Sequence, residues 1–233
     1  MLKTIAFAAA VGAVCSFAAA DDLLYSQPQV SGTPAGISLT EGGNQFSFAD
    51  RRRADNFALP FPAEVDFVRF WGGTESDFFG SDNISNIDAF NIRIFADDGG
   101  VPGSILLDET VSKAAVNPTL VPGQQVGFLN ADMFRFEAAL PSSVTLAANQ
   151  QYWVSVAADV INPVGLNAEG WQWAASDVGD DVLAQRNFDG AGYFVNVNSP
   201  RDAAFEFEGV IIPTPASAAL LPLAGLVAMR RRR

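Results

Sequence analysis

The chain has 233 residues, a formal charge of −12, one cysteine and no histidine. It therefore cannot form a Ser-His-Asp or Cys-His catalytic set, a histidine metal site, an intramolecular disulfide or a Cys-x-x-Cys metal knuckle. The acidic charge argues against nucleic-acid binding, because phosphate groups would be repelled. A hydrophobic content of 49% with 19 phenylalanines is enough for a substantial core.

Residues 1–20 have the layout of a secretory signal peptide. Lys3 makes the start positive, residues 5–17 are almost continuously apolar, and three alanines precede Asp21. A cut after Ala20 would leave small residues at the two positions that matter for cleavage. The alternative is a buried helix or a membrane anchor, but the stretch is short for a span of about 20 residues. We expect the chain to be exported, and Cys15 to be lost with the leader.

Residues 21–209 are predicted to form one strongly acidic domain. All 26 acidic residues lie in it and five of the 14 basic residues do not, so its formal charge is −17. Apolar and polar residues alternate with period two, for example at 90–94 and 205–208, and helical periodicity is absent. Turn signals such as residues 71–73 and 121–123 separate these runs. The pattern predicts an all-β fold, an antiparallel two-sheet sandwich of jelly-roll type in preference to a closed barrel.

Two kinds of chemistry would use the many carboxylates of this domain. A glycosidase needs a facing pair, for which Glu137, Glu169, Glu206 and Glu208 are weak candidates, since solvated strand faces explain them as well. Calcium takes six to eight oxygen ligands and accepts them from acidic, glycine-rich loops. The calcium candidates are Asp97, Asp98, Asp177, Asp180 and Asp181. Ordinary turn formation and solubility are the alternative explanation for these loops.

Aromatic residues offer a second kind of site. Trp171 and Trp173 are two residues apart, so in a strand they share one face. Such a pair can form a flat platform for sugar rings, and it can equally be part of a core filled with aromatic side chains.

The C-terminal segment, residues 210–233, has three parts in a fixed order. Its stiff start is Pro213, Thr214, Pro215, Ala216 and Ser217, its middle is apolar up to Met229, and its end is Arg230, Arg231, Arg232 and Arg233. As a helix, the apolar part would reach about 21 Å, less than the roughly 30 Å of a bilayer core. An arginine cluster stays on the cytoplasmic side. We therefore expect a hydrophobic helix outside the domain that holds the chain in the membrane transiently, although a permanent anchor is the alternative.

This three-part order resembles the PEP-CTERM sorting signal of Gram-negative bacteria. Pro213, Pro215, Ala216 and Ser217 match the motif, and Thr214 replaces its usual glutamate. The resemblance implies processing by an exosortase, a membrane-embedded cysteine protease, which would be the partner of this tail. It also implies delivery to the cell surface or the extracellular polysaccharide matrix.

The body has a weaker resemblance, to an uncharacterised β-sandwich domain recurrent in exported proteins with such tails. It rests on the runs 54–59, 68–72, 90–104 and 152–155, and it implies no catalytic residues. The favoured interpretation is a non-enzymatic surface or matrix protein with a structural or adhesive role. The alternative is a module that binds matrix polysaccharide through Trp171 and Trp173, with or without calcium, and a carboxylate-dependent glycosidase comes third. No nucleic-acid partner is expected, and membrane contact only through the C-terminal helix.

Overall fold

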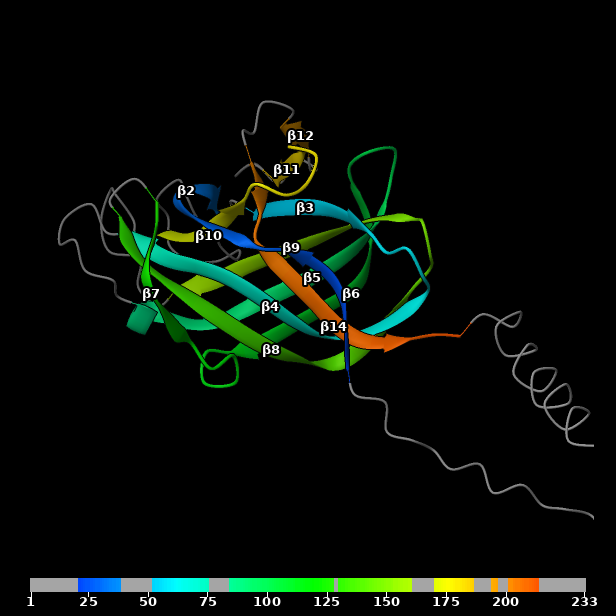
Figure 1. Ribbon diagram of the computed structural model, residues 1–233, viewed down its shortest axis with the longest axis horizontal. Coiled ribbons are helices and arrows are strands. Elements are labelled where there is room, and N and C mark those ends of the chain that lie inside the picture. The colour runs from blue at the N-terminus through cyan, green and yellow to red at the C-terminus, as the bar shows by residue number, and fades with distance from the viewer. Residues whose placement is uncertain are drawn as a thin grey trace, which may run out of the picture.

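The computed structural model describes residues 21–38, 52–75, 84–127, 130–160, 170–186, 194–196 and 201–213. These residues form strands and one short 3₁₀ turn, η1 (Ile84–Asn86), so the all-β prediction is confirmed (Figure 1). None of the helices within these ranges is long and apolar enough to cross a membrane. The predicted signal peptide and the sorting tail after Pro213 lie outside the described residues.

The strands form two sheets. The larger has the order β1-β14-β4-β8-β7-β2-β10-β13 and the smaller the order β12-β11-β3-β9-β5-β6. In the larger sheet the strands are β1 (Asp22–Gln27), β2 (Gln29–Ile37), β4 (Ala63–Glu75), β7 (Thr119–Val126), β8 (Ala131–Leu146), β10 (Gly170–Ser176), β13 (Asp202–Ala203) and β14 (Phe205–Ile211). In the smaller they are β3 (Arg52–Ala58), β5 (Ile87–Asp97), β6 (Pro102–Ser112), β9 (Gln151–Val160), β11 (Leu183–Arg186) and β12 (Phe194–Asn196). All pairings are antiparallel except that of β2 with β7.

The larger sheet closes on itself, and the predicted two-sheet jelly-roll sandwich is therefore wrong. β4 pairs with β8 on one side and with β10 on the other, so that β4, β8, β7, β2 and β10 form a five-stranded barrel. The smaller sheet stays open. Closure places residues 71–73, predicted as a turn, within β4. A Cβ atom on Gly72 would overlap the carbonyl oxygen of Gln172 in β10, so the missing side chain lets the two strands meet.

The main hydrophobic core lies between the barrel and the smaller sheet. Phe70 and Trp171 project from the barrel toward Phe90 in β5, with ring centroids 5.0 and 5.4 Å from that of Phe90. At the other end of the core, Phe57 in β3 lies 4.9 Å from Phe207 in β14. The smaller sheet thus covers the apolar outer face of the barrel, which would otherwise be exposed to water.

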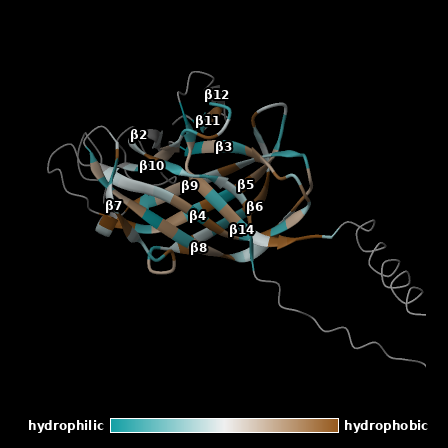
Figure 2. Cartoon of the chain, in the orientation of Figure 1, coloured by the Kyte–Doolittle hydropathy of each residue, from teal (hydrophilic) through white to brown (hydrophobic). Residues whose placement is uncertain are grey.

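A second cluster fills the barrel itself. Trp71, Val126, Met133 and Ala174 are buried together and come from four of the five barrel strands. Trp71 alternates along β4 with Phe70 of the main core, as residues on opposite faces of a strand must. Strand β8 of the barrel alternates between buried and more exposed residues over much of its length, and hydrophobic and hydrophilic residues also alternate along β4 (Figure 2).

Candidate functional site

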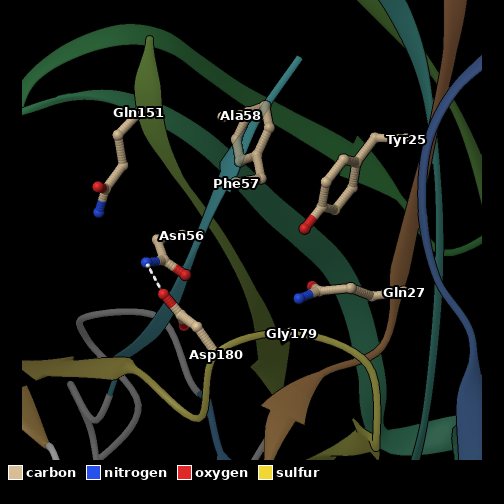
Figure 3. A pocket seen from close by; sticks show the side chains of 8 residues that line it. All are labelled: Tyr25, Gln27, Asn56, Phe57, Ala58, Gln151, Gly179 and Asp180. Atoms are coloured by element: carbon tan, nitrogen blue, oxygen red, sulfur yellow. Dashed lines mark hydrogen bonds between the residues drawn. The ribbon is translucent and has the colours of Figure 1, made fainter. Parts of the chain in front are cut away.

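A cavity of about 240 Å³ lies where the edge of the larger sheet meets the smaller sheet (Figure 3). Its lining combines aromatic rings, three side-chain amides and one carboxylate. The lining residues are Tyr25 and Gln27 from β1, Asn56, Phe57 and Ala58 from β3, Gln151 from the start of β9, and Gly179 and Asp180 from the loop after β10. Four segments that are distant in the sequence therefore build one hollow with both polar and apolar groups in its wall.

Aromatic packing holds β1 and β3, strands of different sheets, at the cavity. The ring centroids of Tyr25 and Phe57 are 5.6 Å apart. Tyr25 also stacks on Phe205 of β14, at 5.3 Å and an interplanar angle of 23°. Because Phe57 is 4% exposed, its ring is fixed by the core behind it and forms a rigid apolar part of the wall.

Hydrogen bonds pin the loop at residues 177–181 to the other side. The carboxylate of Asp202 accepts from the backbone N–H groups of Asp181 and Val182, at 3.0 and 3.2 Å. Asp180 accepts from Val182 N at 3.1 Å and from Asn56 Nδ2 at 3.0 Å, the bond drawn in Figure 3. A Cβ atom on Gly179 would overlap the carboxylate of Asp202, so only glycine allows the loop to pack this closely.

Two buried carboxylates adjoin the lining. Asp55 is 0% and Asp202 1% exposed. Asp55 accepts hydrogen bonds from Asn56 N at 2.8 Å and Ala203 N at 2.7 Å, and so links the two sheets. Burial raises the pKa of Asp55 well above its ordinary value, and the charge of Asp202 raises it further. Burial likewise raises the pKa of Asp202.

The phenol of Tyr25 lies close to these carboxyl groups. Burial is the main cause of the raised pKa of Tyr25, and the charges of Asp55, Asp202 and Asp180 add to it in that order. The phenol therefore stays protonated well into the alkaline range. It faces the cavity as a neutral hydroxyl near three acidic groups.

Gln27 lines the cavity, but its amide oxygen is buried. Its side chain is 1% exposed, and its Oε1 atom is buried without a hydrogen-bond partner. Figure 3 shows the amide extending from β1 into the space between Tyr25 and Asp180. An unsatisfied buried acceptor costs about 1–3 kcal/mol, so this amide oxygen destabilises the fold locally.

One family model matches residues 25–207 of the chain. The chain belongs to this family, the domain of unknown function DUF7901. No curated protein and no solved structure matches the chain. All residues that line the cavity fall within the matched range, whereas the PEP-CTERM-like tail lies outside it. The sorting signal therefore stays a prediction.

In this DUF7901 domain, both tryptophans of the expected sugar platform belong to the core. Trp171 and Trp173 are each 0% exposed. Trp171 lies against Phe70 and Phe90, and Trp173 donates from Nε1 to the carbonyl oxygen of Ala204 at 2.9 Å. Neither ring has a face open to a ligand, because the smaller sheet covers this side of the barrel. The core-packing alternative is the one that the structure shows.

Three of the four glutamates considered for catalysis meet on the open face of the larger sheet. Glu137, Glu206 and Glu208 all pair with Arg69, at 3.0, 2.6 and 2.9 Å. Burial lowers the pKa of Arg69, but its hydrogen bonds to Glu206 and Glu137 outweigh this effect, and the net shift is upward. These carboxylates neutralise one arginine on a strand face and do not line the cavity, while Glu169 lies outside the described residues.

The calcium candidates Asp97 and Asp98 lie in the turn between β5 and β6. Asp97 accepts from the indole Nε1 of Trp153 at 2.8 Å and from Gly100 N at 3.1 Å. The backbone N–H of Asp98 donates to Val101 at 2.9 Å, while its side chain is exposed. Asp97 thus has a structural role that its residue type allows without a metal ion.

The other three candidates occupy the loop after β10. Asp177 pairs with Arg201 at 2.8 Å, Asp181 takes a left-handed backbone with φ of 60°, and Asp180 lines the cavity. Within the described ranges, no three acidic, histidine or cysteine side chains converge to hold a metal ion. Calcium binding stays a prediction.

Most of the cavity residues were missed by sequence reasoning, which singled out only Asp180. One signal was available at Asp55. It shares the period-two phase of Phe57 and Leu59 and therefore places a carboxylate on the apolar face of a strand. A charged residue at a position that alternation assigns to the buried face of a strand indicates a buried polar network. Gln27 and Gln151 carried no comparable signal.

Proposed function

We propose that this protein is exported to the cell surface or extracellular matrix and acts there without catalysis, as an adhesive domain that holds one sugar residue of a matrix polysaccharide. The observation that carries this proposal is the cavity with its three amides and its aromatic rings. It replaces the two buried tryptophans as the place where a carbohydrate would bind.

The chemistry of the lining suits a sugar ring. Each hydroxyl group of a sugar both donates and accepts, and amide side chains such as those of Asn56 and Gln151 offer both functions at one position. The rings of Tyr25 and Phe57 supply apolar surface for the C–H face of the sugar. The fixed positions of Phe57 and the 177–181 loop reduce the entropy lost on binding.

The size of the cavity limits what it can hold. Typical small-molecule pockets have about 300–1,000 Å³, and 240 Å³ is below that range. It corresponds to the volume of about eight water molecules. The cavity suits one sugar residue, at a chain end or a branch, and is too small for several residues of a backbone.

A non-catalytic role is supported by the placement of the carboxylates. A glycosidase uses two carboxyl groups on opposite sides of the bond that is broken. Among the described residues, Asp180 is the one carboxylate in the cavity lining, and the buried groups Asp55 and Asp202 each accept two backbone hydrogen bonds.

Binding of the purified protein to an array of bacterial polysaccharides and monosaccharides tests the proposal. Gln151→Ala should weaken binding about three- to tenfold, the effect of one lost neutral hydrogen bond. The matched control is Gln150→Ala, which removes the adjacent amide, a group that does not line the cavity. Equal binding by both variants and the parent would refute the assignment of the cavity.

Export and processing are supported by the sequence features at the two ends of the chain. The test is mass spectrometry of the protein recovered from the surface or matrix fraction. We expect the mature chain to begin at Asp21 and to lack the arginine cluster. Recovery of an intact Arg230–Arg233 end from that fraction would contradict processing at the tail.

A further inference from the structure

Two carboxyl groups are buried together behind the cavity, where the two sheets touch. Asp55 and Asp202 are both fully buried. Asp55 lies in β3 of the smaller sheet, and its carboxyl group accepts the backbone N–H of Ala203 in β13 of the larger sheet at 2.7 Å. Removing a charge from water is costly unless an opposite charge compensates for it. Ionisation of both groups is therefore costly at this contact between the sheets.

The charges with the largest effect on this pair are negative. Burial raises the pKa of Asp55 well above its ordinary value, and the charges of Asp202 and Asp180 raise it further, against the opposing effect of two backbone hydrogen bonds. Burial also raises the pKa of Asp202, and the charges of Asp180 and Asp181 add to this effect, again against two backbone hydrogen bonds. The titratable group that β1 adds nearby is the phenol of Tyr25, which is neutral. Protonation of one carboxyl group therefore relieves a repulsion between like charges.

The basic side chains next to the pair in the sequence have other neighbours. Arg53, two residues before Asp55, lies against Gly36 of β2, where an added Cβ atom would be 2.7 Å from Arg53 Nε. Arg201, directly before Asp202, pairs with Asp177 at 2.8 Å. Burial and like charges thus dominate the surroundings of the pair.

The strands beside β3 place apolar residues against Asp55. Its partners in the adjacent strands are Leu183 of β11 and Val154 of β9, and both are buried. The next titratable side chain on that face of β9 is Tyr152, whose hydroxyl accepts the backbone N–H of Ala147 at 2.9 Å. Since β3 is paired on both sides, Asp55 is held in a rigid part of the fold.

The loop at residues 177–181 covers the pair and is the part that can move. Its residues are exposed, unlike those of β3. A Cβ atom on Gly179 would overlap the carboxylate of Asp202, so the backbone of the loop lies directly on this group. Asp202 in turn accepts two consecutive backbone N–H groups at the end of the loop, at 3.0 and 3.2 Å. Displacement of the loop is therefore the least costly way for water to reach the two charges.

We infer that Asp55 and Asp202 form a pH-sensitive latch, which holds the loop at residues 177–181 closed while the pair carries a proton and lets it open when both groups are ionised. Because Gly179 and Asp180 line the cavity, opening of the loop displaces one wall of the cavity (Figure 3). The inference concerns this wall and does not depend on which ligand the cavity binds.

Amide hydrogen exchange of the purified protein, measured by NMR at a series of pH values and corrected for the exchange rate of an unstructured chain, tests the inference. The readout is the protection of the Asp181 and Val182 amides, which Asp202 binds. Opening releases a proton, because the buried pair binds it more tightly than the exposed pair. The open fraction should therefore rise about tenfold per pH unit between the pKa of the exposed pair and that of the buried pair.

The amides that pair β5 with β9 in the smaller sheet provide the internal reference. They should show no such dependence on pH, because the loop opens without them. Protection of Asp181 and Val182 that does not change with pH would overturn the inference. An equal dependence at the reference amides would show that the whole domain opens, and would overturn it too.

Two substitutions separate charge from hydrogen bonding. Asp55→Asn keeps an oxygen that can accept from Ala203 N but cannot ionise, so the protection of the loop amides should largely lose its dependence on pH. Asp98→Asn removes a carboxyl group from an exposed turn and should keep the pH dependence of the parent. An unchanged dependence in Asp55→Asn would contradict the latch. If this variant does not fold, a carbon-13 NMR titration of the carboxyl groups in the parent decides, and ordinary pKa values for both Asp55 and Asp202 would overturn the inference.

Discussion

The closure of the barrel can be tested at Gly72. An added methyl group there would overlap the carbonyl oxygen of Gln172 and lie 2.7 Å from the Cε2 and Cζ2 atoms of the Trp171 indole. Neither neighbour is free to move. The carbonyl belongs to a strand paired on both sides, and Trp171 is 0% exposed within the main core. Gly72→Ala must therefore either separate β4 from β10 or displace a packed ring.

The expected loss follows from these contacts. Overpacking of a rigid core costs about 1–3 kcal/mol. Because neither the Gln172 carbonyl nor the Trp171 ring can move, we expect a cost at the upper end of this range. Alanine gains about 0.5–1 kcal/mol because it restricts the unfolded chain more than glycine does. The net destabilisation should be about 2 kcal/mol. For a domain of this size, the melting temperature should fall by about 4–8 °C.

Urea and thermal unfolding of the purified protein, followed by circular dichroism, measure this loss. Adding Trp171→Phe removes the indole atoms that the methyl would meet, and should recover about 1 kcal/mol relative to the sum of the two single effects. A free energy of unfolding for Gly72→Ala within about 0.5 kcal/mol of the parent would refute the close contact between β4 and β10.

Three further predictions concern polar groups. Gln27→Met removes the unpartnered acceptor and should raise the free energy of unfolding by about 1 kcal/mol; a loss of stability in urea denaturation would show that the amide is already satisfied. The pKa of Asp55 is raised in the folded protein, so this carboxyl group binds a proton more tightly there than in the unfolded chain. Its contribution to the free energy of unfolding therefore increases as the pH falls through the folded pKa, and is lost as the pH rises through it. Asp55→Asn should therefore flatten the acid side of the stability profile, and an unchanged slope in unfolding experiments across that range would contradict this. Arg69→Met removes the arginine that Glu137, Glu206 and Glu208 share, leaves Glu137 with Arg135 alone, and should cost about 1–2 kcal/mol, after allowance for solvent screening. High salt should reduce this cost, and a salt-independent loss would indicate lost packing instead of charge repulsion.

Local patterns predicted the strands because alternation is a property of a few neighbouring residues. At 90–94, Phe90, Ile92 and Ile94 are fully buried while Arg93 remains partly exposed. The same local reasoning is wrong at Gly72, because a glycine at this place in the sequence predicts a turn. In β4 this residue allows the close approach of another strand, and nothing in the adjacent sequence distinguishes the two uses.

At the candidate site, too, some features follow from the sequence and others only from the tertiary structure. The sequence by itself determined an acidic all-β domain without histidine chemistry, and it placed Asp180 in a loop rich in oxygen ligands. Only the tertiary structure decided that Trp171 and Trp173 are buried, because the smaller sheet covers their face of the barrel. It also brought Gln27 and Asp180 into one cavity, across about 150 residues of chain. Period-two patterns report which face of a strand is apolar, whereas the pairing of distant strands decides which of these faces meet and where a hollow remains between them.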